Sequence, residues 1–200
     1  MKFSEAKDID RLNGSRMIPY QKEKVENAVL FFAQQQQKCA RKPLYQTYLF
    51  KYLAFLDFES LKLTGRPSLG LTYRALEKGP VPIALYNREM EFDSFDFIND
   101  EQGKYVKAKK GPDMSYFSNF EIKLMDKLIE IFATRYVYSK HMSDASHEEI
   151  SAWRKTRRSN PDGIIDFSLT FDGDLHGKSN EELTYPEECY LLQCAFDEPH

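Results

Sequence analysis

The chain has 200 residues, of which 42% are hydrophobic, and a formal net charge of −3. This length suffices for one well-buried core and is short for two full domains. No stretch approaches the roughly 20 apolar residues of a membrane-spanning helix, and the N-terminal sequence lacks the apolar centre of a signal peptide. Three cysteines at no disulfide-framework spacing are typical of a reducing compartment. We therefore expect a cytoplasmic protein.

The charge is unevenly distributed along the chain. From Asn160 to the end there are ten acidic residues and a single lysine, whereas the part up to Ser159 has 27 cationic and 21 acidic residues. An acidic C-terminal segment of this kind folds back on a basic body, meets a basic partner, or is simply solvated. We divide the chain into a flexible segment 1–18, a domain 19–159 and an acidic C-terminal extension 160–200.

The first part of the domain predicts two helices. The second of these helices is expected to begin at Pro43, because proline fits the first position of a helix. From Leu44 to Leu56 apolar residues lie nearly all round a helix, which predicts a buried central helix. The first helix is predicted from Tyr20 to Ala40, because apolar residues recur there at helical spacing, at Val25, Ala28, Val29, Phe32 and Ala33.

Strand patterns and turn residues follow. The segment from Leu69 to Ala75 alternates and predicts a short strand. Gly79–Pro82 predicts a rigid elbow, because each proline fixes its own φ and keeps the preceding residue out of the α region. We expect Val81 to be extended, a helix to begin at Pro82, and no ligand in this elbow, since two N–H donors are missing. Alternation from Phe92 to Lys110 predicts a hairpin.

Two capping boxes predict helix starts in the second half of the domain, at Ser118 and at Ser146. The only tryptophan, Trp153, follows the second box. We expect it to be buried against the helix that begins at Ser118 and against the central helix.

Beyond the domain, Ile164–Phe171 predicts a strand and Cys189–Phe196 a terminal helix. Together these elements predict an α+β fold that is mainly α-helical. Its helical core should carry a small antiparallel β-sheet of two or three strands.

The sequence contains no coherent catalytic or cofactor-binding motif. Its glycines match neither the dinucleotide nor the P-loop arrangement. His141 and His147 are six residues apart and Cys189 and Cys194 five apart, which fits no common zinc motif. We therefore expect no catalytic residues, no metal and no cofactor. The acidic residues after Asn160 lack the spacing of an EF-hand loop, and we interpret them as solvated: Asp162, Asp166, Asp172 and Asp174.

Two alternative functions remain open. His147 with Glu148 and Glu149 resembles an acid/base group of a hydrolase, although the first turn of a helix favours such carboxylates for electrostatic reasons alone. The basic run Arg154–Arg158 fits phosphate binding by a DNA-binding regulator, but it also fits the cationic end of a helix. A regulator would require this run to join other cations on one face.

Six short motifs occur in a characteristic order between residues 44 and 156. They are Lys51-Tyr52-Leu53-Ala54-Phe55-Leu56-Asp57, Thr64-Gly65-Arg66-Pro67, Gly70-Leu71-x-Tyr73-x-Ala75, Gly79-Pro80-Val81-Pro82, Phe117-Ser118-x-Phe120-Glu121, and Met142-Ser143-Asp144-x-Ser146-His147-Glu148-Glu149 with Ala152-Trp153. In order and spacing this segment resembles the SocA-like antitoxin (Panacea) domain of bacterial and phage toxin–antitoxin systems. The chain departs from the family's Leu-Leu-Tyr-Phe-Ala after the lysine, and the segment past Asn160 has no counterpart in it.

The resemblance implies a mainly helical α+β antitoxin without catalytic residues. Such a protein neutralises a co-encoded protein toxin by direct contact or, in some members, delivers it to a protease. The sequence leaves the identity of the toxin and the oligomeric state undetermined.

We expect the contact surface to lie around the elbow and the small sheet, because tyrosine and arginine commonly anchor interfaces and recognition usually lies on loops. In one alternative the tyrosines Tyr73 and Tyr86 pack inward and the cations are only solvated. In another, the acidic extension is the surface that holds the toxin. The candidate contact residues are Arg66, Tyr73, Lys78, Tyr86 and Arg88.

Overall fold

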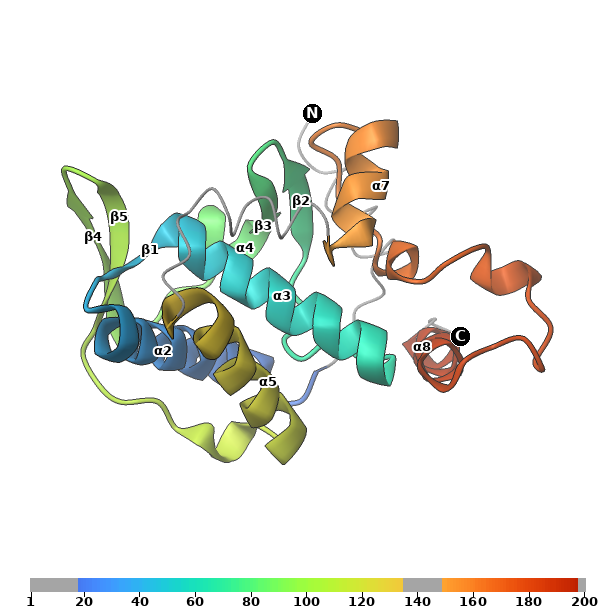
Figure 1. Cartoon of the computed structure of the whole chain (residues 1–200), viewed down its shortest axis with the longest axis horizontal. Coiled ribbons are helices and arrows are strands. Elements are labelled where there is room, and N and C mark those ends of the chain that lie inside the picture. The colour runs from blue at the N-terminus through green and yellow to red at the C-terminus, as the bar shows by residue number, and fades with distance from the viewer. Residues whose placement is uncertain (1–17, 135–148, 198–200) are drawn as a thin grey trace.

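Two helices, α2 (Gln21–Ala40) and α3 (Gln46–Thr64), form the centre of the fold in a computed structural model that describes residues 18–134 and 149–197 (Figure 1). Phe32 of α2 stacks on Tyr52 of α3, with ring centroids 4.6 Å apart. The Tyr52 hydroxyl donates to Oε1 of Gln36 at 2.9 Å. Both predicted helices are confirmed, and α3 is buried over most of its circumference as its apolar pattern requires.

The start of α3 differs from the prediction. Pro43 is not its first residue, because Leu44 and Tyr45 form a short strand, β1 (Leu44–Tyr45), and the helix begins at Gln46. β1 pairs antiparallel with β5 (Gly103–Ala108), which pairs in turn with β4 (Phe95–Asp100). The β4–β5 hairpin is confirmed. The long-range pairing with β1 overrode the local helix signal of the proline.

A second, two-stranded sheet contains the predicted elbow. Gly79–Pro82 forms strand β3, which pairs with β2 (Tyr73–Leu76). The expectation of a simple elbow was therefore wrong, although Val81 is extended and a short helix, α4 (Ile83–Tyr86), does follow. β3 tolerates Pro80 and Pro82 because it lies at the sheet edge, where missing N–H donors cost no ladder bond.

The next helix, α5 (Asn119–Ile129), begins as predicted. The Ser118 side chain accepts from the Glu121 N–H, and the Glu121 carboxylate accepts from the Ser118 N–H, so the capping box is complete. A short helical turn, η1 (Met114–Tyr116), precedes α5, and a wider turn, η2 (Glu130–Thr134), continues it. α5 packs against α2 and α3.

Trp153 lies in α7 (Ser151–Ser159) and is buried, as expected. Its indole N–H donates to the Leu76 carbonyl oxygen at 3.0 Å. The expected neighbours were wrong, since α7 packs chiefly against β2 and η3 (Phe167–Thr170). A hydrogen-bond acceptor at a strand end suits the polar edge of the indole better than an apolar helix face. The capping box at Ser146 lies outside the described residues.

The C-terminal extension folds back on the domain. Ile164 makes a single antiparallel bridge with Arg74, so the predicted strand at 164–171 is limited to that bridge and then becomes η3. After η4 (Leu175–Gly177), the predicted terminal helix is confirmed as α8 (Tyr185–Asp197), which packs on α3. Buried apolar side chains of the extension join the core: Ile165, Phe167, Phe171, Leu175 and Tyr190.

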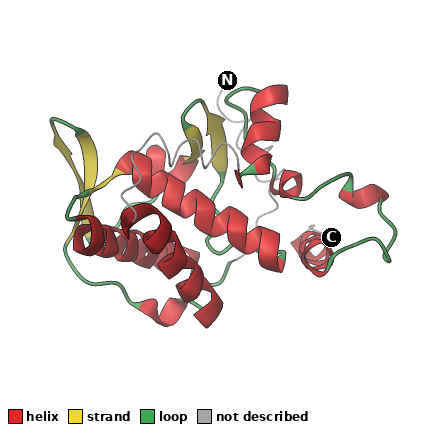
Figure 2. Cartoon of the chain, viewed as in Figure 1, coloured by secondary structure: helices red, strands yellow, loops and turns green. Residues whose placement is uncertain are grey.

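With helices throughout and two small antiparallel sheets, the fold class is the predicted one, α+β and mainly helical (Figure 2). None of the described helices is long and apolar enough to cross a membrane.

Candidate protein-binding site

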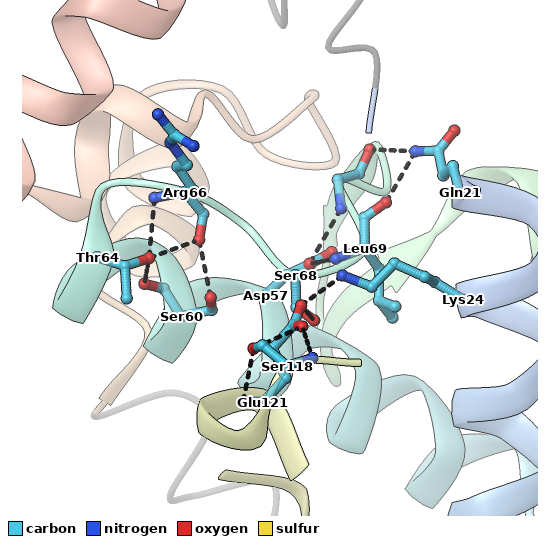
Figure 3. Close-up of polar contacts among 11 residues, drawn as sticks. Gln21, Lys24, Asp57, Ser60, Thr64, Arg66, Ser68, Leu69, Ser118 and Glu121 are labelled. Atoms are coloured by element: carbon cyan, nitrogen blue, oxygen red, sulfur yellow. Dashed lines mark hydrogen bonds and ion pairs between the residues drawn. The ribbon is translucent and has the colours of Figure 1, made fainter. Parts of the chain in front are cut away.

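A fully buried carboxylate, Asp57 of α3, anchors the loop that follows this helix (Figure 3). Its Oδ1 accepts from the N–H groups of Leu69 and Gly70, at 2.5 and 3.1 Å. Its Oδ2 accepts from the Leu71 N–H at 3.1 Å and from the Tyr73 hydroxyl at 2.9 Å. Four donors on one carboxylate fix the path of the chain from α3 into β2.

Burial raises the pKa of both partners at the end of this network, Asp57 and Tyr73. Burial raises the pKa of Asp57, although the four hydrogen bonds act in the opposite direction. Burial and the neighbouring Asp57 charge raise the pKa of the Tyr73 hydroxyl well above its ordinary value. Tyr73 is 1% exposed, so its assignment to the contact surface was wrong. The aromatic ring packs against Phe58, and the hydroxyl donates its hydrogen bond to Asp57.

A second carboxylate, Glu121, lies next to this loop and is paired with a cation. Its Oε1 accepts from the Lys24 ammonium and from the Ser68 hydroxyl, both at 2.5 Å. Burial opposes ionisation, but the hydrogen bonds from Lys24, Ser68 and Ser118 outweigh it and lower the pKa of Glu121. The cluster joins the start of α2, the loop after α3 and the start of α5, as Figure 3 shows.

An open pocket of about 480 Å³ lies over this cluster. Arg66 and Phe120 lie at its rim as exposed side chains, and Gln193 of α8 lines it from the C-terminal extension. The Gln193 Oε1 is buried and has no hydrogen-bond partner among the described residues. The pocket therefore combines a cation, an aromatic ring and an unused acceptor.

The backbone at Arg66 is anchored while its side chain extends outward. Its carbonyl oxygen accepts from the Ser60 hydroxyl at 2.8 Å and from the Thr64 hydroxyl at 3.2 Å. In Figure 3 the guanidinium points away from this network. Gly65, just before it, has φ +75°, and a Cβ there would meet the Pro186 carbonyl oxygen of α8 at 2.2 Å. Only glycine allows α8 to approach this closely.

Tyr185, the first residue of α8, completes this surface. Its hydroxyl interacts mainly with the Cys189 thiol, which raises its pKa, and the charge of Arg66 acts on it in the opposite direction. Its side chain is 72% exposed. We call the exposed set Arg66, Phe120 and Tyr185 the Arg66 surface. It brings together residues that lie more than 50 positions apart in the sequence.

The remaining predicted contact residues lie elsewhere. Lys78 occupies the β2–β3 turn, and Arg88 follows α4 with φ +58°. Tyr86 is 58% exposed and its ring lies 6.4 Å from that of Phe50, in the first part of α3. Arg66 lies just beyond the C-terminal end of α3, roughly 20 Å from Phe50 at a rise of 1.5 Å per residue. The structure thus separates Arg66 from Lys78, Tyr86 and Arg88.

The residues of the alternative functions are mostly engaged in internal contacts or not described. Arg157 pairs with Asp162 at 2.6 Å. Lys155 donates to the carbonyl oxygens of Leu169 and Phe171, at 3.0 and 2.8 Å. These bonds hold the extension against α7, while Arg154 and Arg158 of the same run are exposed. His147 lies outside the described residues, and the described ones contain no group of three or more His, Cys, Asp or Glu that could hold a metal ion.

The described part of the chain is thus a mainly helical domain whose anchored loop carries an exposed arginine beside an exposed aromatic ring. The model of the antitoxin SocA-like, Panacea-domain family matches residues 49–154, slightly more than half of the chain. The chain belongs to this family. No curated protein and no solved structure matches it.

The family motifs meet in the Asp57 network, which sequence reasoning missed. Asp57 ends the first motif and binds the backbone of the third, while Ser118 and Glu121 of the fifth close the neighbouring cluster. The sequence contained a signal for it, because the Asp57 carboxylate lies between Leu56 and Phe58 in a helix that is apolar nearly all round, and a buried carboxylate must find donors.

Proposed function

We propose that this protein is an antitoxin that neutralises a protein toxin encoded beside it, by direct contact through the Arg66 surface. Membership of the SocA-like family supports an antitoxin role. The observation that carries the proposal is that exposed Arg66 and Phe120 line one pocket on a fixed backbone, with exposed Tyr185 close enough to Arg66 to interact with its charge. Arginine and aromatic side chains are the types that contribute most binding energy at protein interfaces.

Preorganisation favours this surface over the one around α4. The Arg66 backbone is held by two hydroxyl bonds, and the following loop by Asp57. A partner that binds here orders few additional groups, so less of the interaction free energy is lost as conformational entropy. An acidic side chain of the toxin would meet the exposed Arg66 guanidinium.

The extension contributes Tyr185 to this surface and Gln193 to the adjoining pocket, and its buried side chains belong to the core. A chain ending at Ser159 would therefore lose core packing as well as Tyr185. Point substitutions in the full-length protein test the surface more cleanly than truncation.

The experiment expresses the product of the adjacent reading frame with and without the full-length protein and scores growth. Arg66→Glu and Phe120→Ala should abolish rescue and co-purification of the two proteins. The matched variants Arg88→Glu and Tyr86→Ala make the same changes of charge and ring on the α4 side and should preserve both. Rescue lost only in the α4 variants would move the interface there, and an adjacent product that is not toxic would refute the antitoxin role.

A further inference from the structure

A groove of about 650 Å³ runs between the second half of α2 and strand β5, on the side of the molecule where the β4–β5 hairpin extends (Figure 1). Four lysines line it, and no acidic side chain does. Its apolar wall includes Ala33, Pro43, Leu44 and Val106. The charged residues of the lining are Lys38, Lys107, Lys109 and Lys110.

The positive charge of this groove is only partly neutralised. Lys109 pairs with Asp96 at 2.8 Å, with both side chains exposed, and the exposed Lys110 pairs with the partly buried Glu26 at 3.3 Å. Lys38 and Lys107 are exposed and form no salt bridge within the described residues. Two cations of the groove are therefore available to an anionic partner, and two more lie in pairs that solvent weakens.

The groove also exposes an unpaired part of the edge of strand β5. β1 pairs only with Tyr105 and Val106 of β5. The Lys109 N–H donates to Ser94 on the β4 side, so by the alternation of an antiparallel ladder the N–H and C=O of Ala108 point toward the β1 side. The ladder with β1 ends at the pair Leu44–Val106, so Ala108 lies beyond the paired part of this edge. Both Lys107 and Ala108 line the groove.

We infer that this groove binds an extended acidic segment of a partner protein, which lies alongside β5 and pairs with its free edge. The open backbone groups of Ala108 give such a segment main-chain hydrogen bonds, as in other cases of strand addition. The lysines select carboxylate side chains through charge complementarity. The apolar wall accommodates the alternate side chains that an extended peptide directs inward.

A polypeptide fits this groove better than a nucleic acid. A strand edge recognises a peptide backbone, which has matching donors and acceptors, whereas a phosphodiester backbone has acceptors only.

This inference is independent of the antitoxin proposal. The groove adjoins the start of α3, whereas the Arg66 surface lies at its far end, roughly 25 Å away for a helix of this length. Substitutions in one site leave the other intact, so the two can fail separately.

The test measures fluorescence anisotropy of a labelled peptide with alternating Glu and Val, added to the full-length protein at low ionic strength. The double variant Lys38→Glu/Lys107→Glu should weaken binding at least about tenfold. The control Lys123→Glu/Lys127→Glu makes the same charge change on exposed positions of α5, and Lys127 lies in the last turn of its helix as Lys38 does. The control should bind within about twofold of the unaltered protein.

Two further probes separate the parts of the inference. A peptide with Gln in place of Glu, and an acidic peptide whose alternate backbone nitrogens are methylated, should both bind much more weakly. Equal binding of the acidic peptide by both double variants would overturn the site, and equal binding of the methylated peptide would overturn strand pairing. Tighter, lysine-dependent binding of a labelled DNA duplex would assign the groove to nucleic acid instead.

Discussion

The two buried carboxylates on either side of the loop after α3 are stabilised in opposite ways. Asp57 is fully buried and is surrounded by neutral donors only, whereas Glu121 is near the surface and pairs with the Lys24 cation. Burial prevails at Asp57 and raises its pKa, while hydrogen bonds prevail over burial at Glu121 and lower its pKa. Neutral donors can hold a buried carboxylate in place without making its charge favourable, and a cation does both.

The largest expected effect comes from removing the deeper carboxylate. Asp57→Ala leaves three backbone N–H groups and the Tyr73 hydroxyl without their acceptor, and should lower the free energy of unfolding by about 4 kcal/mol in urea titrations. Asp57→Asn keeps the shape and one acceptor oxygen and should cost about half as much. An alanine variant as stable as the unaltered protein would show that the loop does not depend on this network.

Glu121→Gln should have an intermediate effect of about 2 kcal/mol at neutral pH, because the Lys24 ammonium and the Ser68 hydroxyl lose a charged acceptor. Its pH dependence distinguishes the two carboxylates. A lowered pKa contributes stability that is present above the ordinary Glu value and lost as pH falls through the folded value. The difference in unfolding free energy between the unaltered protein and Glu121→Gln should therefore stay constant from neutral pH down to the ordinary Glu value and shrink as pH falls below it.

The opposite trend is expected for Asp57. A raised pKa contributes stability that is present below the ordinary Asp value and lost as pH rises through the folded value. The difference between the unaltered protein and Asp57→Asn should grow as pH falls toward that ordinary value. Urea unfolding of both variants at several pH values measures how each difference in unfolding free energy changes with pH. Differences that change in the same direction would contradict the contrast between Asp57 and Glu121.

The smallest effect is expected for an exposed pair on the β4–β5 hairpin. Lys109 and Asp96 are each about half exposed. Lys109→Ala should change the free energy of unfolding by less than about 0.5 kcal/mol, because solvent screens the attraction. A loss of stability as large as that of Glu121→Gln would show that solvent exposure does not explain the difference between the Lys109–Asp96 and Lys24–Glu121 pairs.

Local sequence patterns determined the elements whose signals lie within a few residues. The Ser118–Glu121 capping box, the apolar periodicity of α2 and the alternation of the β4–β5 hairpin are complete within their own segments. The family motifs likewise identified the domain, which the match over 49–154 confirms. These features could be predicted because backbone hydrogen bonding and burial patterns repeat over short distances.

Tertiary structure alone decided which segments meet. The helix predicted to begin at Pro43 starts later, because Leu44 and Tyr45 pair with β5. Gly79–Pro82 forms a strand because β2 lies beside it. Tyr73 turns inward because Asp57, 16 residues earlier, needs a donor. The Arg66 surface and the lysine groove each combine residues more than 50 positions apart, and their side-chain distances depend on how whole helices pack. No short pattern carries that information, because long-range contacts depend on the packing of the entire core.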